Sequence, residues 1–315
     1  MKRCWDSMKS AIVTGANGFI GKAVCKKLLA NGIRTCAIVR DPQTMKDISE
    51  DDNLIVIQGD ITDIPSIKYN LGKGNYEVFY HFAWVGTSGK VLTEDSVQIR
   101  NIEYTCNMLR LAKELNCNKY IFAGTINELE LVSLYKAEMF IPRPASIYGI
   151  SKLACDFMCK TLAANMNINY NTAIIGSCFG PGDMSWRIHN NFIKGMLEGV
   201  QPKLVAGEVW HDWVFIDDVA DMLVAIGRKS VNLKNYYIGH RELRLLKDIL
   251  CEVRDILCAG LELKFGEITD NFKIDYSLVD LNAVYEDTGY ECKTEFSVAI
   301  VKTAEWVSER LIKNI

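Results

Sequence analysis

Two residues of this sequence, Tyr148 and Lys152, have the types and spacing needed to move a proton. They are four positions apart, so on a helix they share one face. A neighbouring ammonium group and a positively charged nicotinamide ring both favour the phenolate, and so lower the phenol pKa from its usual value of ~10. Tyr148 could then accept or donate a proton at a carbinol oxygen.

A glycine loop near the start of the chain predicts the cofactor for this chemistry. Gly15, Gly18 and Gly21 follow the apolar run at 10–14 and precede an amphipathic stretch that reaches Ala30. Gly15 allows a tight turn, Gly18 lets the backbone approach a pyrophosphate, and Gly21 lets a helix pack closely on the strand. The free N–H groups at the helix start would then bind the phosphates.

The residues after the next two strands bear on which dinucleotide binds. The strand predicted at 34–39 is followed by Arg40, which would pair with a 2′-phosphate, and by Asp41, which would still reach a ribose hydroxyl. We therefore favour NADP(H) and leave NAD(H) open. Asp60 follows the strand predicted at 54–58, and it is either an acceptor for the adenine amino group or a turn or cap aspartate.

Strands that alternate with helices position these residues. The alternation predicts an α/β fold with a Rossmann-like, doubly wound parallel sheet. Thr125 closes the fifth strand at the carboxyl edge of the sheet, where its hydroxyl can hold the same oxygen as Tyr148. The strands are predicted at 10–14, 34–39, 54–58, 78–82, 119–123 and 171–175, with long helices at 95–115 and 146–165.

The pattern changes after Gly176, which predicts two unequal parts. Residues 1–176 would form the NAD(P)-binding domain, with a return segment near 208–240. Residues 177–315 would form most of a smaller C-terminal lobe for the substrate. Within this lobe helices are predicted at 188–198, 244–258 and 296–312, and residues 261–293 are expected to be irregular.

Composition excludes several classes of protein. The chain has 315 residues, is 49% hydrophobic and carries a formal net charge of -3, so a large core is expected and a nucleic-acid partner is not. No apolar run approaches the ~20 residues of a membrane helix, and the first residues lack the apolar centre of a signal peptide. We expect a soluble cytoplasmic protein that does not bind membranes.

The cysteines and histidines favour no metal site. The 11 cysteines have no repeated pair spacing, and the 4 histidines are not spaced as ligands. Cys155 and Cys159 are four apart and would be part of a metal site only with further ligands. We expect free cysteines that pack as small hydrophobic side chains in a reducing compartment.

Taken together, the motifs resemble the extended short-chain dehydrogenases/reductases, in the nucleotide-sugar epimerase/dehydratase branch. The resemblance implies a Rossmann-like domain with bound NAD(P) and a C-terminal lobe that binds a nucleotide-diphosphate sugar. It also implies a homodimer built from the helices near 95–115 and 146–165. The matching segments are Thr14 to Gly21, Gly59-Asp60-Ile61, His81-Phe82-Ala83, Tyr148 to Lys152, Gly180-Pro181-Gly182-Asp183 and Asp212 to Val219.

Carried over position by position, the resemblance implies roles for individual residues. Thr125, Tyr148 and Lys152 would be catalytic, and His211 stands where many members have an arginine for the substrate diphosphate. Either Arg187 or another cation takes over that contact, or diphosphate binding differs here, with His211 as a neutral donor. Further cofactor contacts are implied for Asn17, Phe19, Ile20, Ile61 and Ala83, and for Lys152, which would also position the ribose. Further substrate contacts are implied for Trp84, Glu128 and Ser177.

The residues after Thr125 bear on the reaction. Sugar dehydratases of this family usually follow the threonine with an Asp-Glu pair, whereas here Ile126 and Asn127 follow and Glu128 is one position late. We therefore discount 4,6-dehydratase activity. Glu128 either contacts a sugar hydroxyl or is a buried, hydrogen-bonded carboxylate.

Two family reactions remain. Arg40 favours a reductase that uses NADPH once on a 4-keto-(6-deoxy)sugar nucleotide, and the alternative is a 4-epimerase that retains NAD. A non-catalytic NADP(H)-binding regulator is a third hypothesis, against which the intact Thr125, Tyr148 and Lys152 argue.

Overall fold

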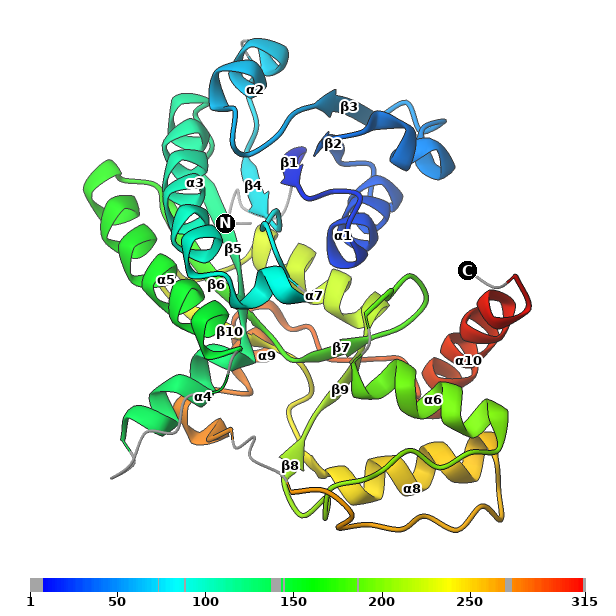
Figure 1. The fold of residues 1–315 in the computed structure, drawn as a ribbon. Helices are drawn as coiled ribbons and strands as arrows, with labels where there is room; N and C mark the ends of the chain where they lie inside the picture. The colour runs from blue at the N-terminus through cyan, green and yellow to red at the C-terminus, as the bar shows by residue number, and fades with distance from the viewer. Residues whose placement is uncertain are drawn as a thin grey trace.

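A parallel sheet forms the centre of the computed structural model, with seven strands in the order β10-β6-β5-β4-β1-β2-β3 (Figure 1). The structure describes residues 8–72, 74–87, 89–136, 143, 145–185, 187–269 and 274–313. The strands of this sheet are β1 (Ser10–Thr14), β2 (Arg34–Val39), β3 (Leu54–Gln58), β4 (Val78–His81), β5 (Lys119–Thr125), β6 (Asn169–Ile175) and β10 (Asn235–Ile238).

Helices cover both faces of this sheet, which is why its strands are short apolar runs rather than alternating ones. On one face α1 (Phe19–Ala30) packs against α7 (Ile216–Arg228). On the other face α2 (Ile64–Leu71) and α5 (Ser146–Met166) lie beside α3 (Asp95–Glu114) (Figure 1). Two large hydrophobic clusters, one under each layer, form most of the core, and a third, smaller cluster contains Ile126 and Leu129.

The order of the strands reverses at β1, which has β2 on one side and β4 on the other. In open sheets of this kind, ligands bind in the crevice outside the carboxyl ends of the strands at such a reversal. β1 ends at Thr14, β4 at His81 and β5 at Thr125. The segments that follow these three residues therefore meet at one edge.

The second part of the chain lies beyond that edge, in the lower half of Figure 1. There α6 (Ile188–Glu198), α8 (Leu246–Leu257) and α10 (Phe296–Lys313) pack against one another. Two small sheets lie within this part, β7 (Ser177–Phe179) with β9 (Trp213–Phe215), and β8 (Trp210–His211) with β11 (Arg244–Leu245). The remaining elements are η1 (Pro42–Ile48), η2 (Lys90–Thr93), α4 (Ile126–Tyr135), η3 (Tyr276–Leu278) and α9 (Ala283–Thr288).

Part of the second half returns to the central sheet. β10 pairs in parallel with β6 and so completes one edge. Lys119, at the start of β5, donates from Nζ to the carbonyls of Ile226 and Gly227, each at 3.0 Å. These carbonyls belong to the last turn of α7, where a helix has no partners of its own for them. The division at residue 176 stays a prediction, and the two predicted parts share one sheet.

The predicted strands coincide closely with the observed ones, and three helices were not expected, one of them α9 within the stretch 261–293 that was expected to be irregular. The runs predicted at 10–14, 34–39 and 54–58 are β1, β2 and β3. α2 is short, and α4 begins directly where β5 ends. No glycine or proline separates the strand from α4, because Thr125 is both the last strand residue and the N-cap of the helix.

The ten described cysteines are free. Three of them meet between α3 and α5, where the Sγ atom of Cys159 lies 3.9 Å from that of Cys106 and 4.0 Å from that of Cys155. Across the described residues, no group of three or more His, Cys, Asp or Glu side chains is arranged to hold a metal ion. No helix in the described part of the chain is long and apolar enough to cross a bilayer.

Candidate active site

The glycine loop between β1 and α1 leaves no room for a side chain at Gly15 or Gly21. Gly15 has a φ of +66°, and a Cβ atom there would lie 2.8 Å from the backbone nitrogen of Ala83. A Cβ atom on Gly21 would lie 2.2 Å from the carbonyl oxygen of Gly15. Gly18 is the N-cap of α1. It has no side chain, so the free N–H groups of the first turn receive no capping hydrogen bond from it. This close-fitting cradle at a helix start suits a pyrophosphate, so the residues fit a dinucleotide.

His81 joins the ends of β1 and β4 beside that loop. Its Nδ1 lies 2.8 Å from the Thr14 hydroxyl, and its Nε2 lies 3.2 Å from the Thr105 hydroxyl on α3. The Thr14 hydroxyl also accepts a bond of 3.4 Å from the N–H of Ala83. Burial, together with the Lys152 charge, lowers the pKa of His81 to about 3, so the ring is neutral. Sequence analysis gave His81 no role, although its motif was noted.

The predicted catalytic residues come together at the carboxyl edge of the sheet. Tyr148 and Lys152 lie one turn apart on α5, and Lys152 is buried. Its Nζ donates a 2.9 Å bond to the carbonyl of Ala123, on the same strand as Thr125. The Thr125 hydroxyl also lies near enough to the Tyr148 phenol to lower its pKa. One ammonium, one phenol and one hydroxyl are thus held within a single group.

Trp84 covers this group. The Nζ atom of Lys152 lies 3.8 Å from the centre of the Trp84 ring, and the Tyr148 ring meets that ring edge-on at 6.0 Å. Such a cation–π contact stabilises the charged lysine in a place that water cannot reach. The Trp84 side chain therefore contacts the two predicted catalytic residues on α5, and the substrate contact predicted for it stays a prediction.

Two buried amides on α3 hold the loop that carries Trp84, and sequence analysis missed both. The Oε1 atom of Gln98 accepts a 2.8 Å bond from the indole N–H of Trp84, and its amide nitrogen donates to Gly86. Asn101 accepts from the N–H of Val85 at 2.9 Å and donates to its carbonyl at 2.8 Å. The sequence signal for such a role is a pair of polar residues three positions apart on the inward face of a long helix.

The pKa values of the catalytic residues differ from their ordinary values. Burial raises the pKa of Tyr148 to about 12, although the Arg187 charge and the Thr125 hydroxyl oppose this rise. Desolvation thus outweighs the neighbouring charges of the protein itself. The lowering expected from Lys152 together with the positive nicotinamide ring stays a prediction. Burial lowers the pKa of Lys152 to about 8.

Glu128 has a structural partner. Its Oε1 accepts a 2.8 Å bond from the backbone N–H of Thr125, while the Thr125 hydroxyl accepts from the N–H of Asn127 at 3.4 Å. These reciprocal bonds form a capping box at the start of α4. Glu128 is 3% exposed, and this arrangement corresponds to the buried, hydrogen-bonded carboxylate of the two alternatives.

The residues predicted to choose the cofactor lie on loops after β2 and β3. Arg40 is exposed directly after β2. The Oδ1 atom of Asp41 accepts a 2.9 Å bond from the N–H of Gln43 and so caps η1. The Oδ1 atom of Asp60 accepts from both the N–H and the hydroxyl of Thr62, at 3.0 and 2.9 Å, which is the turn geometry. Arg40 and Asp41 are thus both exposed on this loop, and the Asp41 carboxylate is the one engaged as a cap.

The other predicted cofactor contacts surround the glycine loop. Asn17 is exposed, Phe19 and Ile20 are half-buried in the first turn of α1, and Ile61 is buried after β3. A Cβ atom on Gly182 would lie 3.5 Å from the Phe19 ring. The loop after β7 therefore reaches the glycine loop across the crevice.

The other three predicted substrate residues, after Trp84 and Glu128, lie in the second part of the chain. Ser177 begins β7 and pairs with Trp213, and the buried His211 lies on β8. Arg187 precedes α6, is exposed, and acts electrostatically on Tyr148. The structure thus brings Arg187 toward the catalytic group, whereas Ser177 and His211 lie on the strands beside it.

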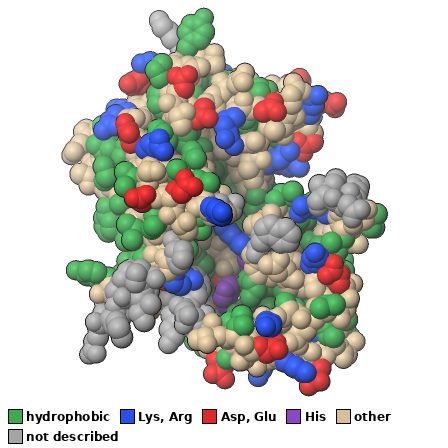
Figure 2. Space-filling view, viewed as in Figure 1, with side chains coloured by type: hydrophobic (Ala, Val, Ile, Leu, Met, Phe, Trp, Pro, Cys, Tyr) green, Lys and Arg blue, Asp and Glu red, His purple; other side chains and the backbone are tan. Residues whose placement is uncertain are grey.

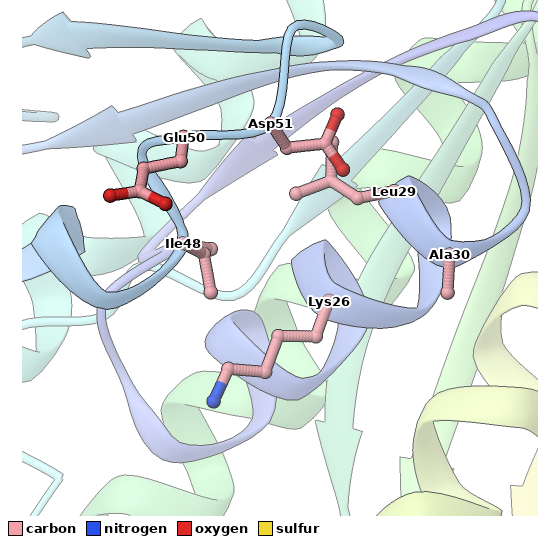
Figure 3. A pocket seen from close by; sticks show the side chains of 6 residues that line it. All are labelled: Lys26, Leu29, Ala30, Ile48, Glu50 and Asp51. Atoms are coloured by element: carbon pink, nitrogen blue, oxygen red, sulfur yellow. The ribbon is translucent and has the colours of Figure 1, made fainter.

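Figure 2 shows a hollow between the upper and lower parts of the molecule, in which Lys or Arg side chains and a histidine are visible. Basic surfaces of this kind attract anionic ligands. A second, shallow depression lies at the outer end of α1, against the end of η1 and the loop that follows it (Figure 3). It contains none of the predicted site residues, and it is lined by Lys26, Leu29, Ala30, Ile48, Glu50 and Asp51.

Comparison with known proteins agrees with this geometry. The model of the NAD dependent epimerase/dehydratase family matches residues 11–239. The chain is 21% identical to a dTDP-L-rhamnose 4-epimerase of Burkholderia thailandensis over 96% of both proteins. Its fold is similar to that of a Thermotoga maritima UDP-glucose 4-epimerase solved with UDP-glucose, with a TM-score of 0.77, 20% identity and coverage of 96% and 99%.

A further solved structure with a similar fold contains both a nucleotide sugar and a dinucleotide. It is a Bacillus cereus UDP-glucuronic acid 4-epimerase in complex with UDP-glucuronic acid and NAD. The TM-score is 0.74, the identity is 22%, and the match covers 95% of this chain and 99% of the other.

Proposed function

The chain belongs to the NAD dependent epimerase/dehydratase family, and on this premise we propose that it is an NAD(P)-dependent enzyme acting at C4 of a nucleotide-diphosphate sugar. The observation that carries the proposal is the convergence of Thr125, Tyr148 and Lys152 beside the glycine loop. The ammonium of Lys152 lies 5.8 Å from the centre of the Tyr148 ring.

In the proposed reaction, Tyr148 moves a proton at the C4 oxygen. The Thr125 hydroxyl donates to the same oxygen and stabilises the charge that develops on it. Lys152 keeps a positive charge close to the phenol, and Trp84 shields that charge from water. The nicotinamide, when bound, supplies or accepts the hydride at C4. The cradle of Gly15, Gly18 and Gly21 would hold its pyrophosphate.

Between the two reactions, we favour a 4-epimerase that retains its cofactor. The support is that the three compared proteins are 4-epimerases, one of which was solved with NAD. A 4-keto-sugar reductase that uses NADP(H) is the second candidate, and Arg40 supports it. Arg40 is exposed after β2, while the Asp41 carboxylate is engaged as a cap. A 2′-phosphate would therefore find a guanidinium there.

For the substrate, we propose that Arg187, Ser177 and His211 contact the nucleotide sugar from the second part of the chain. Arg187 supplies the positive charge for a phosphate, since His211 stands in place of the expected arginine. This arrangement keeps residues 1–176 as the cofactor domain and most of residues 177–315 as the substrate lobe.

We also propose a homodimer through the outer faces of α3 and α5, which pack side by side. Large apolar side chains are exposed there, with Ile99 at 61%, Ile150 at 51% and Phe157 at 63%. Apolar side chains gathered on two adjacent helices are the usual mark of a protein interface. Light scattering of Phe157→Glu should then show a smaller species than the unmodified protein.

The test of the proposed function is the cofactor. The purified protein should be denatured, and the released dinucleotide identified, before any sugar is added. Retained NAD, with interconversion of C4 epimers and no net change in reduced cofactor, supports the epimerase. Consumption of NADPH with a 4-keto sugar nucleotide supports the reductase. Absence of any turnover with bound cofactor would support a non-catalytic binding protein instead.

The reductase candidate also predicts a change of cofactor preference. Arg40→Ala should lower the ratio of NADPH to NADH efficiency about tenfold or more, because a charge-assisted hydrogen bond contributes roughly 1.5–3 kcal/mol. Arg110→Ala, an exposed arginine on α3, is the control. An unchanged preference in Arg40→Ala removes the support for the reductase.

A further inference from the structure

We propose that Glu128 is a positioning residue, which fixes the catalytic hydroxyl of Thr125 through the capping box of α4. The proposal rests on the proposed function and adds a residue to it. Glu128 contacts the backbone of Thr125 rather than the substrate. Its role is therefore to act through Thr125.

The first support is the hydrogen bonding of Thr125. This residue ends β5 and is the N-cap of α4, so its backbone belongs to two elements at once. Its N–H is bound by Glu128 Oε1 at 2.8 Å, and its hydroxyl oxygen accepts from Asn127 N–H at 3.4 Å. With the oxygen occupied as an acceptor, the hydroxyl proton is free to be donated outward. The Tyr148 phenol is close enough for this hydroxyl to lower its pKa.

The second support is the packing that surrounds the carboxyl group. Glu128 is buried at the junction of β5 and β6, where a Cβ atom on Gly124 would lie 3.0 Å from Glu128 Oε1 and 2.7 Å from Thr172. A Cβ atom on Gly149, next to Tyr148, would lie 3.1 Å from the carbonyl oxygen of Asn127. The start of α4 is therefore tightly fitted between the sheet and the residue beside Tyr148. Loss of the hydrogen bond between the Thr125 N–H and Glu128 would therefore require Thr125 to move.

The third support is electrostatic. Asp156 on α5 is the charged neighbour that opposes ionisation of Glu128, while Lys152 and Lys160 on the same helix favour it. Burial and Asp156 raise the pKa of Glu128 to about 8, although the Thr125 N–H opposes the rise. Ionised Glu128 in turn raises the pKa of Tyr148. Glu128 and the Tyr148 phenol therefore interact electrostatically as well as through the position of Thr125.

The experiment compares Glu128→Ala with Glu128→Gln. Alanine removes the acceptor of the hydrogen bond from the Thr125 N–H. Glutamine keeps an oxygen that accepts this bond, but its side chain cannot ionise. We expect Glu128→Ala to lower kcat at least tenfold with KM and cofactor affinity within about twofold of the unmodified protein. Glu128→Gln should keep most of kcat at pH 7. Its kcat relative to the unmodified protein should then rise as the pH passes 8, because no charge develops beside Tyr148.

A measurement that needs no substrate accompanies the kinetics. Hydrogen exchange of the Thr125 amide should accelerate at least tenfold in Glu128→Ala and remain near its original rate in Glu128→Gln. The control is Asp51→Ala, which removes the hydrogen bond to the Asn53 N–H before β3, at the opposite edge of the sheet from the site. It should lower stability without affecting either measurement.

Two results would overturn the proposal. One is an unchanged Thr125 exchange rate in folded Glu128→Ala. The other is a rise of KM with constant kcat, which would mean that Glu128 binds the substrate directly. Failure of the proposed function is a separate result, because the unmodified protein would then show no turnover while the exchange measurement remained readable.

Discussion

The two sides of the crevice are built by different means. On the cofactor side, the loop from Gly15 to Gly21 is shaped by backbone atoms that approach to within the space of one methyl group. On the catalytic side, Thr125, Tyr148 and Lys152 are placed by side chains from β5, α3, α4 and α5. A short local motif is enough for the first, whereas the second depends on packing between distant segments.

This difference predicts a separation of effects between the two sides. Changes on the catalytic side should reduce turnover and leave cofactor affinity intact. Changes on the cofactor side should do the reverse. Variants with a large single effect test the separation directly.

The largest effect is expected for Tyr148→Phe. Removal of the phenolic oxygen should lower kcat by about 10²–10⁴-fold, which is the usual contribution of a positioned acid–base group. Cofactor affinity should stay within about twofold, measured by fluorescence titration. Tyr69→Phe, an exposed tyrosine on α2, is the matched control. Turnover that survives in Tyr148→Phe would remove Tyr148 from the reaction.

The reverse effect is expected for Gly21→Ala. The added Cβ has backbone within 2.2 Å, so α1 must shift away from β1. Such overpacking costs about 1–3 kcal/mol, and we expect cofactor affinity to fall by about 10–100-fold. Gly32→Ala, which has open space around its Cβ, is the control for an added methyl group. An intact affinity in Gly21→Ala would mean that the cradle is not the cofactor site.

A smaller effect on the catalytic side is expected for Trp84→Leu. Loss of the ring over Lys152 should lower the free energy of unfolding by about 1–2 kcal/mol, measured by urea denaturation. The double variant Trp84→Leu/Lys152→Met should be destabilised by less than the sum of the single variants, since the two groups interact. Additive effects would show that the stacking contributes little.

The smallest effect is expected for His81→Asn on the cofactor side. It is a change in how steeply the free energy of unfolding depends on pH. His81 has a folded pKa of about 3 against 6.5 unfolded, so between these values the unfolded chain binds more protons. Stability from this residue is therefore complete above pH 6.5 and lost as the pH falls toward 3. His81→Asn should be less stable at pH 7 and lose stability more gradually on acidification. If His81→Asn and the unmodified protein lost stability equally steeply on acidification, the acid sensitivity would come from groups other than His81.

The sequence predicted the central sheet well, because apolar runs such as 10–14 and 34–39 are the direct consequence of burial on both faces. It did not predict α4, since helix and strand meet at Thr125 with no turn residue between them. The T-x-x-E spacing of Thr125 and Glu128 is the signature of a capping box. The sequence analysis interprets Glu128 as either a substrate contact or a buried carboxylate, and this spacing instead indicates the start of a helix.

Predictions for the site divide in the same way. The glycine loop and the Tyr148–Lys152 pair follow from local spacing, and the structure brings Thr125 to them. The supports of Trp84, namely Gln98 and Asn101, come from a helix beyond the reach of any local motif. The pKa of Tyr148 depends on burial that only the packed molecule reveals.

The return of β10 to the central sheet limits how this protein can be divided or shortened. A fragment that stopped at Gly176 would expose the hydrogen-bonding edge of β6 and strip α1 of its neighbour α7. Such a fragment would invite edge-to-edge aggregation rather than fold as a free-standing cofactor module. Modular exchange of the substrate lobe between relatives must therefore be done by replacing inserted segments between 177 and 212 and after 240, and not by joining halves.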